Sequence, residues 1–391
     1  MNGMLTNHFL SQEERAELAL FTQSVERFCA AEIEPHYREW EKAGQVPREL
    51  FAKMGEHGFL CADVPECYGG AGANVNFSFA VIEVLSRLGY AGFVGGLQVH
   101  TDIIPPYLLH FGTEAQRQYW LPRMVQGNAI AAIAMTEPGA GSDLKAIRSH
   151  ARRDGDSYVI NGSKIFISNG QNADLFVLAA KTDPSAGAKG VSLFLVDASA
   201  PGFKRGRRLE KVGQHAGDTS EIFFDDMRVP ADALLGGVEG QGFVQMMREL
   251  PRERLIIAVQ GVNAAKGALD ATVRYVRERE AFGHSLAQFQ NTRFKLAQAA
   301  TDIAAADAFT AACVDAYRRG ELTPEAASAL KLHVSELFGR VADECLQLFG
   351  GYGYMAEYPI SRFWTDARVL RIYGGTSEVM KELVARSLLG R

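Results

Sequence analysis

The stretch from Ala134 to Asp143, which reads AMTEPGAGSD, places a proline, three small residues, a hydroxyl and an acid after a short apolar run. Small residues let a flat ligand lie against the backbone, and free N–H groups together with Thr136 and Ser142 can bind its polar edge. The stretch is not a dinucleotide fingerprint, because Leu144 stands where a third glycine is required, three residues after Gly141. A glycine-rich loop that closes a turn is the alternative.

Three further motifs follow this decapeptide: KIFISNG at 164–170, RVP at 228–230 and IYGGTSE at 372–378. With the decapeptide they resemble the acyl-CoA dehydrogenase family, in which they occur in the same order and spacing. The resemblance runs nearly end to end and implies FAD as the cofactor and an acyl-CoA thioester as the substrate.

The first two motifs carry the residues that the resemblance places near the flavin. In family members the decapeptide lies along the isoalloxazine, which implies four contacts: Met135, Thr136, Gly141 and Ser142, the last also touching substrate. Phe166 and Ser168 stand where many relatives have Trp and Thr against the ring. Phe keeps an aromatic face and Ser a hydroxyl, so we expect altered packing rather than lost binding. A core residue of the β domain is the alternative for Phe166.

A second group of cofactor residues is implied further along the chain. The family reaches a neighbouring subunit's FAD with segments like REREAFGHSLAQFQ at 277–290 and QLFGGYGY at 347–354. The matching positions are Arg279, Phe282, Gln290, Gln347, Gly350 and Gly351, followed by Thr376 and Glu378. Arg supplies a charge-matched fork for phosphate. Without the resemblance, Arg279 is a solvated helix charge and the GGYG a helix stop.

These positions also bear on the assembly. Because one FAD then needs residues from two chains, the resemblance implies a homo-oligomer, with a tetramer expected.

The general base departs from the commonest family pattern. Many relatives read YEGT in the last motif, and its Glu removes the substrate's α proton, but the matching residue here is Gly374. A subset, including long-chain acyl-CoA dehydrogenases, carries the carboxylate on the first helix of the C-terminal domain, in a motif like RELPRERL at 248–255. The resemblance to that subset implies Glu253 as the base. The substrate contacts it implies besides Ser142 are Arg254, Tyr373, Gly374 and Gly375.

Helical spacing independently predicts that Glu253 points into apolar surroundings. The face that carries Glu253 is otherwise apolar, with these neighbours: Met246, Leu250, Ile256 and Ile257. Desolvation raises the pKa of a carboxyl toward neutrality, which suits a base that takes a proton from carbon. The alternative is a solvated surface ion pair of Glu253 with the flanking Arg252 and Arg254.

The expected reaction follows from the resemblance. Glu253 takes the α proton while the β hydrogen leaves as hydride to the flavin, and the product is a trans-2-enoyl-CoA. Medium to long or methyl-branched chains are expected, with electrons passed to an electron-transfer flavoprotein. Two rivals stay open: a flavin monooxygenase of the same fold, and an inactive flavoprotein that binds acyl-CoA.

Composition argues against several other classes of protein. The net charge of -5 comes from interspersed acids and bases, which gives no basic face for nucleic acid. No stretch of 18 apolar residues occurs and the N-terminus lacks a signal-peptide pattern, so we expect no membrane insertion. A bacterial cytoplasmic location is expected, with the mitochondrial matrix after processing as second choice.

Cysteine and histidine spacing adds little chemistry. The five cysteines form no Cys-x-x-Cys pair, so we expect reduced, core-forming side chains in a reducing compartment. No pair of histidines has metal-ligand spacing with a carboxylate, and no metal site is expected.

The elements that position these residues fall into three blocks. Helical periodicity after a capping box at Ser11 and Glu14 predicts about five helices up to residue 125. Short β-rich runs follow, with a turn expected at Asn161 and Gly162, and four or five helices after Gly240. At 391 residues the chain exceeds one core, and the predicted class is an α+β multidomain fold. Its domains are an N-terminal all-α domain (1–127), a middle antiparallel β-sandwich or barrel domain (128–235) and a C-terminal α-helical bundle (236–391).

Overall fold

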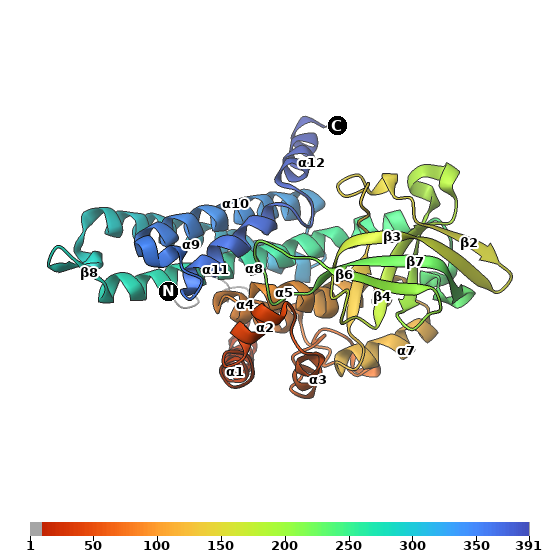
Figure 1. Cartoon of the computed structure of the whole chain (residues 1–391), viewed down its shortest axis with the longest axis horizontal. Helices are drawn as coiled ribbons and strands as arrows, with labels where there is room; N and C mark the ends of the chain where they lie inside the picture. Colours follow the sequence, from red (N-terminus) through yellow and green to blue (C-terminus); the bar gives the residue numbers. More distant parts are fainter. Residues whose placement is uncertain (1–9, 391) are drawn as a thin grey trace.

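The computed structural model describes residues 10–390; the first nine residues, which begin the predicted N-terminal domain, and Arg391 lie outside them. The expected fold class is confirmed: helices come first, a curled β-sheet follows, and a second helical part ends the chain (Figure 1). The sheet occupies one end of the long axis, and the long C-terminal helices extend to the other end.

Seven α-helices precede the sheet within the described residues, where the sequence predicted about five. They are α1 (Gln12–Phe28), α2 (Tyr37–Ala43), α3 (Arg48–Glu56), α4 (Val75–Arg87), α5 (Ala91–Gln98), α6 (Ile104–Phe111) and α7 (Glu114–Val125). One reason is that α5 and α6 lie in a single apolar stretch and are joined by a π-helical turn at Val99–Ile103. The capping box of α1 is confirmed, since Ser11 Oγ accepts from the Glu14 N–H at 3.1 Å and the Glu14 carboxylate from the Ser11 N–H at 2.8 Å.

The middle of the chain forms one seven-stranded sheet. Its strands are β1 (Ala131–Ala134), β2 (His150–Asp154), β3 (Ser157–Ser168), β4 (Leu175–Lys181), β5 (Val191–Asp197), β6 (Phe203–Arg208) and β7 (Thr219–Pro230). The order is β1-β4-β2-β3-β7-β6, with β5 paired to β4. Most pairings are antiparallel as predicted, but β1 runs parallel to β4 and β2 meets β4 in a parallel pairing.

The turn predicted at Asn161 and Gly162 is wrong. Both residues lie inside the continuous strand β3, and the hairpin turn that precedes β3 contains Gly155, with φ at 60°. Gly162 instead allows Ser149 to approach the backbone closely, because a Cβ at this position would lie 2.3 Å from the Ser149 hydroxyl oxygen. The ladder to β7 shifts register beside it.

Five helices follow the sheet in the described residues, in agreement with the four or five predicted. They are α8 (Gly242–Glu278), α9 (Gln290–Arg318), α10 (Pro324–Phe349), α11 (Pro359–Ala367) and α12 (Ser377–Leu389). A small hairpin, β8 (Glu280–Ala281) with β9 (His284–Ser285), joins α8 to α9.

Helix α8 is the spine that connects both helical parts. It continues through Pro251, and every residue from 252 to 265 is buried. It packs against α4 of the N-terminal part and against α9 and α10 of the C-terminal part. A helix that is buried all round belongs to the core of a large protein, so polar groups on it lie in low dielectric.

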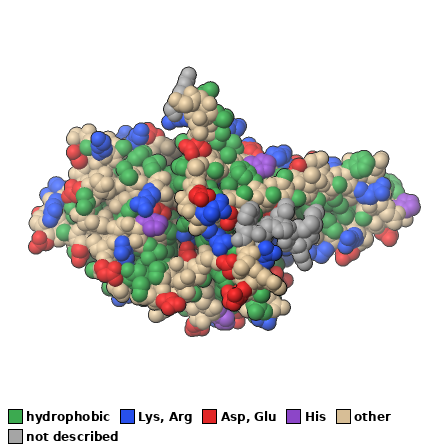
Figure 2. All heavy atoms as spheres, turned by 180° about the vertical axis from the view of Figure 1, so that it is seen from behind, with side chains coloured by type: hydrophobic (Ala, Val, Ile, Leu, Met, Phe, Trp, Pro, Cys, Tyr) green, Lys and Arg blue, Asp and Glu red, His purple; other side chains and the backbone are tan. Residues whose placement is uncertain are grey.

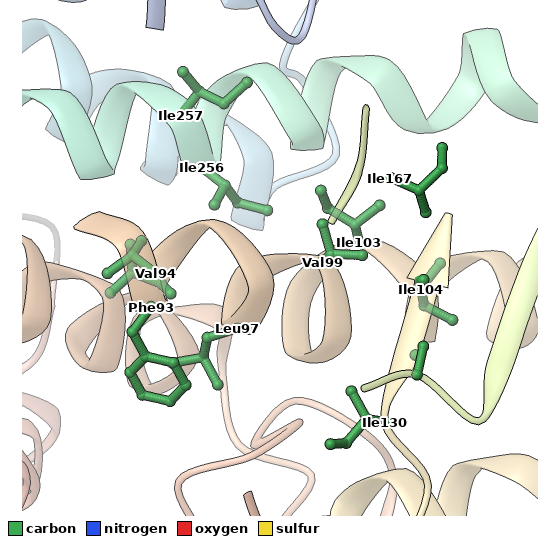
Figure 3. Close-up of a cluster of buried hydrophobic side chains, with 14 of the residues drawn as sticks. Phe93, Val94, Leu97, Val99, Ile103, Ile104, Ile130, Ile167, Ile256 and Ile257 are labelled. Atoms are coloured by element: carbon green, nitrogen blue, oxygen red, sulfur yellow. The ribbon is translucent and has the colours of Figure 1, made fainter. Parts of the chain in front are cut away.

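The three parts share one hydrophobic core around this helix. Figure 3 shows Ile256 of α8 pointing toward the helical segments that carry Val94 and Ile103, with Ile257 on the other side of α8. We propose domain boundaries near residues 127 and 235, which fall in the connections from α7 to β1 and from β7 to α8.

The surface carries mixed charge. On the face shown in Figure 2, basic and acidic side chains are interspersed. Within residues 10–390, none of the helices combines the length and apolar character needed to cross a membrane. Four of the five cysteines are buried as expected, whereas Cys67 is exposed because it lies in the surface 3-10 turn Glu66–Tyr68.

Candidate active site

Glu253 lies on α8 with only 8% of its surface exposed. Its Oε1 accepts a hydrogen bond of 3.0 Å from the hydroxyl of Tyr107 on α6. Burial raises the pKa of Glu253 from 4.5 to about 7; the Tyr107 hydrogen bond opposes this rise, the Glu249 charge adds to it and Arg254 opposes it. A carboxyl with a pKa near neutrality is suited to accept a proton from a carbon acid at physiological pH.

The loop of the last motif crosses the same face of α8. Gly374 has φ at 65°, and a Cβ on it would lie 2.3 Å from Cδ1 of Ile257, one turn beyond Glu253. Tyr373 donates its hydroxyl to Oε1 of Gln260 at 3.0 Å. The structure therefore brings the predicted substrate residues of this loop next to the helix that carries Glu253.

A buried lysine holds this loop from the other side. Lys331 of α10 is fully buried, and its Nζ donates to the Gly375 carbonyl at 2.6 Å. Burial and, after it, the nearby Arg254 charge lower the pKa of Lys331 from 10.5 to about 8. Thr376 caps α12 by accepting from the Val379 N–H at 3.3 Å, and the exposed Glu378 follows in its first turn. Thr376 and Glu378, the last two predicted cofactor residues, thus lie where the Gly374 loop enters α12.

The solvated ion pair considered for Glu253 and its flanking arginines is wrong, because all three side chains are buried. Arg254 donates to Ser328 Oγ of α10 at 3.1 Å, and its Nε has no partner within the described residues. Arg252 instead forms ion pairs with Asp63 at 2.7 Å and with Asp102 at 3.5 Å. The two arginines leave the helix in different directions, which leaves Glu253 between them facing α6.

The residues expected to lie along the flavin are brought together at the edge of the sheet. The Ile165 N–H donates to the Thr136 carbonyl at 3.0 Å. Lys164 is fully buried, and its Nζ donates to the Met135 carbonyl at 3.0 Å and to Glu137 Oε1 at 2.8 Å. Because a buried ion pair demands fixed geometry, it locks the decapeptide against the second motif.

Phe166 does not lie in the core, which was its alternative placement. Its surface is 64% exposed, φ is 61°, and the register between β3 and β7 shifts from Lys164 to Ile167 around it. Bulges of this kind re-aim a side chain next to functional sites. Ser168, at the end of β3, is half-buried.

The decapeptide is open on its outer side. A Cβ at Gly139 or Gly141 would meet nothing within 4 Å, and Ser142 is exposed. An exposed aromatic ring, open glycines and polar hydroxyls fit the flat, polar-edged isoalloxazine of FAD.

The second group of predicted cofactor residues lies at the other end of the molecule. The Arg279 guanidinium lies 5.5 Å from the centre of the Tyr352 ring, so the end of α8 and the glycine loop at 350–354 are neighbours. Phe282, in the hairpin, is 93% exposed, and the two glutamines, Gln290 and Gln347, are also exposed. A Cβ at Gly350 or Gly351 would meet open space.

Within one chain, the residues predicted to lie along the flavin ring are far from the second group of predicted cofactor residues around Arg279. Figure 1 places hairpin β8–β9 and the sheet at opposite ends of the long axis. Arg279, the C-cap of α8, is 26 positions after Glu253, which is about 39 Å along the helix at 1.5 Å per residue.

The sequence did not reveal two contacts of Glu253. Glu249 lies one turn earlier on the same helix face, and this spacing is a signal that could have been read. Tyr107 lies 146 residues away, and nothing in its local sequence distinguishes it from a core tyrosine.

Models of three protein domains match the chain: the acyl-CoA dehydrogenase N-terminal domain at residues 15–128, the middle domain at 132–227 and the C-terminal domain at 240–389. The chain is 45% identical over 377 residues to the mitochondrial long-chain specific acyl-CoA dehydrogenase of Sus scrofa, covering 96% of this chain and 87% of that protein.

Solved structures agree. The acyl-CoA dehydrogenase of Geobacillus kaustophilus superposes with a TM-score of 0.93 at 46% identity, covering 97% of this chain and 99% of that one. A glutaryl-CoA dehydrogenase of Mycobacterium smegmatis in complex with FADH2 gives 0.91 at 30% identity, covering 99% and 97%. The fold is that of FAD-dependent oxidoreductases that act on CH–CH bonds. The chain belongs to the acyl-CoA dehydrogenase family.

Proposed function

We propose that this protein oxidises acyl-CoA thioesters to trans-2-enoyl-CoA products, with Glu253 as the base that takes the α proton. The observation that carries the proposal is a carboxyl with a pKa near 7, buried beside a loop whose matching position, Gly374, has no side chain. Bound FAD supplies the acceptor for the β hydride.

The residues of this chain have separate proposed roles in binding and in proton transfer. Glu253 holds the proton taken from the α carbon, while the Gly374 backbone N–H is proposed to bind the thioester oxygen as negative charge develops there. Lys331 supports that loop through the Gly375 carbonyl. The decapeptide, Phe166 and Ser168 are proposed to hold the flavin ring on the sheet side, and Arg279 with the 350–351 glycines to hold a neighbouring chain's FAD.

Substrate length, partner and assembly belong to the same proposal. Medium to long or methyl-branched acyl chains are proposed, because the Sus scrofa relative is named long-chain specific. An electron-transfer flavoprotein is proposed as the acceptor, a homotetramer as the assembly and the bacterial cytoplasm as the location. None of the observations favours the monooxygenase or the inactive flavoprotein.

Anaerobic mixing of the FAD-loaded protein with acyl-CoAs tests the proposed function. A dehydrogenase bleaches its flavin with substrate alone, and octanoyl- to palmitoyl-CoA should do so faster than butyryl-CoA. Bleaching that needs a separate reductant, followed by oxygen consumption, would point to the monooxygenase. Binding without any bleaching would point to the inactive flavoprotein.

A further inference from the structure

Two donors on α6 meet two carboxylates on α8. Tyr107 Oη donates to Glu253 Oε1 at 3.0 Å, and His110 Nδ1 lies 2.8 Å from Glu249 Oε1. The donors are three residues apart and the acids four, so each pair lies on one face of its helix. The two helices therefore present matched faces at the position of the proposed base.

The two contacts differ in their access to water. Tyr107 is fully buried and Glu253 nearly so, whereas the His110 side chain is 42% exposed while Glu249 is buried. The Tyr107 contact is thus an internal one, whereas the His110 contact lies at the surface.

A buried tyrosine hydroxyl normally needs some partner, and any backbone carbonyl would satisfy it. Here the partner is the carboxylate that the proposed function assigns as the base. A hydrogen bond donated to a carboxylate stabilises its ionised form, which is the form that a base requires. It also fixes one of two otherwise equivalent oxygens, and a base must be held in line with the proton it takes.

We propose, on the basis of the proposed function, that Tyr107 is a positioning residue for Glu253. Its hydroxyl holds Oε1 of the ionised carboxylate and leaves Oε2 to take the proton from the substrate's α carbon. Bound FAD would accept the β hydrogen with its electron pair, so proton and hydride are both accounted for. Tyr107 does not itself exchange a proton in this step.

The charged and titratable groups that face Glu253 are Tyr107 from α6 and, from α8, Glu249 and Arg254. Tyr107 and Arg254 favour the ionised carboxylate, and Glu249 disfavours it. His110 Nδ1 contacts Glu249 Oε1 at 2.8 Å, so Glu249 has its own partner on α6. Loss of Tyr107 therefore shifts the balance toward the protonated, inactive form.

The test is the pH dependence of kcat/KM for Tyr107→Phe, which removes the hydroxyl and keeps the ring. The acid limb of the wild-type profile reports the base of the free enzyme. In Tyr107→Phe the limb should move to higher pH by about one unit, which is ~10-fold lower activity at pH 6. The matched control is Tyr158→Phe, another buried tyrosine that donates to a glutamate, here Glu239 in the sheet region. Its acid limb should stay in place.

A double-mutant cycle separates positioning from packing. In a Glu253→Gln background, Tyr107→Phe should change the residual rate of flavin reduction by less than about 2-fold, because the residue through which it acts is gone. An unchanged acid limb in FAD-loaded Tyr107→Phe, or an equal loss of rate with and without Glu253, would overturn the proposal. If wild type is not bleached by any acyl-CoA, the proposed function fails first, and the two failures remain distinct.

Discussion

Ionising Glu253 in the core costs free energy, because its pKa is about 7 in the fold against an ordinary value of 4.5. Between these values the folded state binds more protons than the unfolded chain, so its stability falls as pH rises. The stabilising contribution of the protonated carboxyl is complete below pH 4.5 and is lost as pH passes 7. At Glu253 the needs of catalysis and of stability oppose each other.

Glu253→Gln should therefore stabilise the protein while it removes the base. At pH 8 we expect a gain of up to about 3 kcal/mol in the free energy of unfolding, since each pKa unit corresponds to about 1.4 kcal/mol. At pH 5 the gain should shrink toward zero. Urea denaturation of the FAD-loaded proteins at both pH values measures it, with the exposed Glu278→Gln on the same helix as control. A gain of equal size at both pH values would contradict the assignment of the raised pKa.

The contact between α8 and the loop of the last motif determines which of the two can carry the carboxylate that acts as the base. Gly374 combines φ at 65° with a would-be Cβ 2.3 Å from Ile257 Cδ1. A side chain at this position must therefore both accept left-handed backbone and displace Ile257, which costs about 1–2 kcal/mol for the backbone alone. The commoner family arrangement, with Glu on this loop, is sterically excluded here while Ile257 is present.

Moving the base onto the loop tests this contact. Gly374→Glu with Glu253→Gln should stay as slow as Glu253→Gln alone, because Ile257 blocks the new side chain. Adding Ile257→Ala should recover part of the lost rate, on the order of 10-fold, with preference shifted toward straight chains. Anaerobic flavin reduction with straight and methyl-branched acyl-CoAs measures both effects. A triple variant that binds FAD and ligand yet reacts no faster would show that the two positions do not face one carbon.

Local signals predicted part of this architecture. The capping box at Ser11 and the burial of the helix face around Glu253 follow from spacing along one helix, and both are present. The turn at Gly162 was wrong because the pairing of β2 with β3 brings Ser149, which requires the glycine, against it. Tyr107 was not predictable, since helix packing alone brings it to Glu253. The order of the motifs pointed to the family, but the spacing of single residues did not reveal its flavin site.

At the scale of the whole molecule, one chain holds the two proposed groups of cofactor-binding residues at opposite ends of its long axis. The part of the molecule around hairpin β8–β9 exposes four large apolar side chains, of which Tyr352 lies against Arg279: Phe282, Phe294, Tyr352 and Tyr354. Exposed apolar patches of this kind mark interaction surfaces. A second copy of the chain is the proposed partner, because the FAD that the sheet side would hold needs the phosphate contacts proposed for this end.

Arg279→Ala should weaken FAD binding by about 10- to 100-fold, the range expected when a charge-assisted hydrogen bond is lost. Phe282→Asp should lower the oligomeric state and the FAD content together. Light scattering after size exclusion and flavin absorbance per chain measure these changes. Leu20→Asp, at an exposed apolar position on α1, is the control and should alter neither. Full FAD content in a monomeric Phe282→Asp protein would contradict a cofactor site shared between chains.

The most direct test of Glu253 as the base is the rate of anaerobic flavin reduction by acyl-CoA in single-turnover stopped flow. Glu249→Gln is the matched control, since it removes a buried carboxyl one turn away on the same helix. Glu253→Gln should bind FAD and acyl-CoA normally and reduce its flavin roughly 100-fold to 10,000-fold more slowly than wild type, while Glu249→Gln stays within about 10-fold. Reduction of Glu253→Gln at a rate near that of wild type would contradict the account.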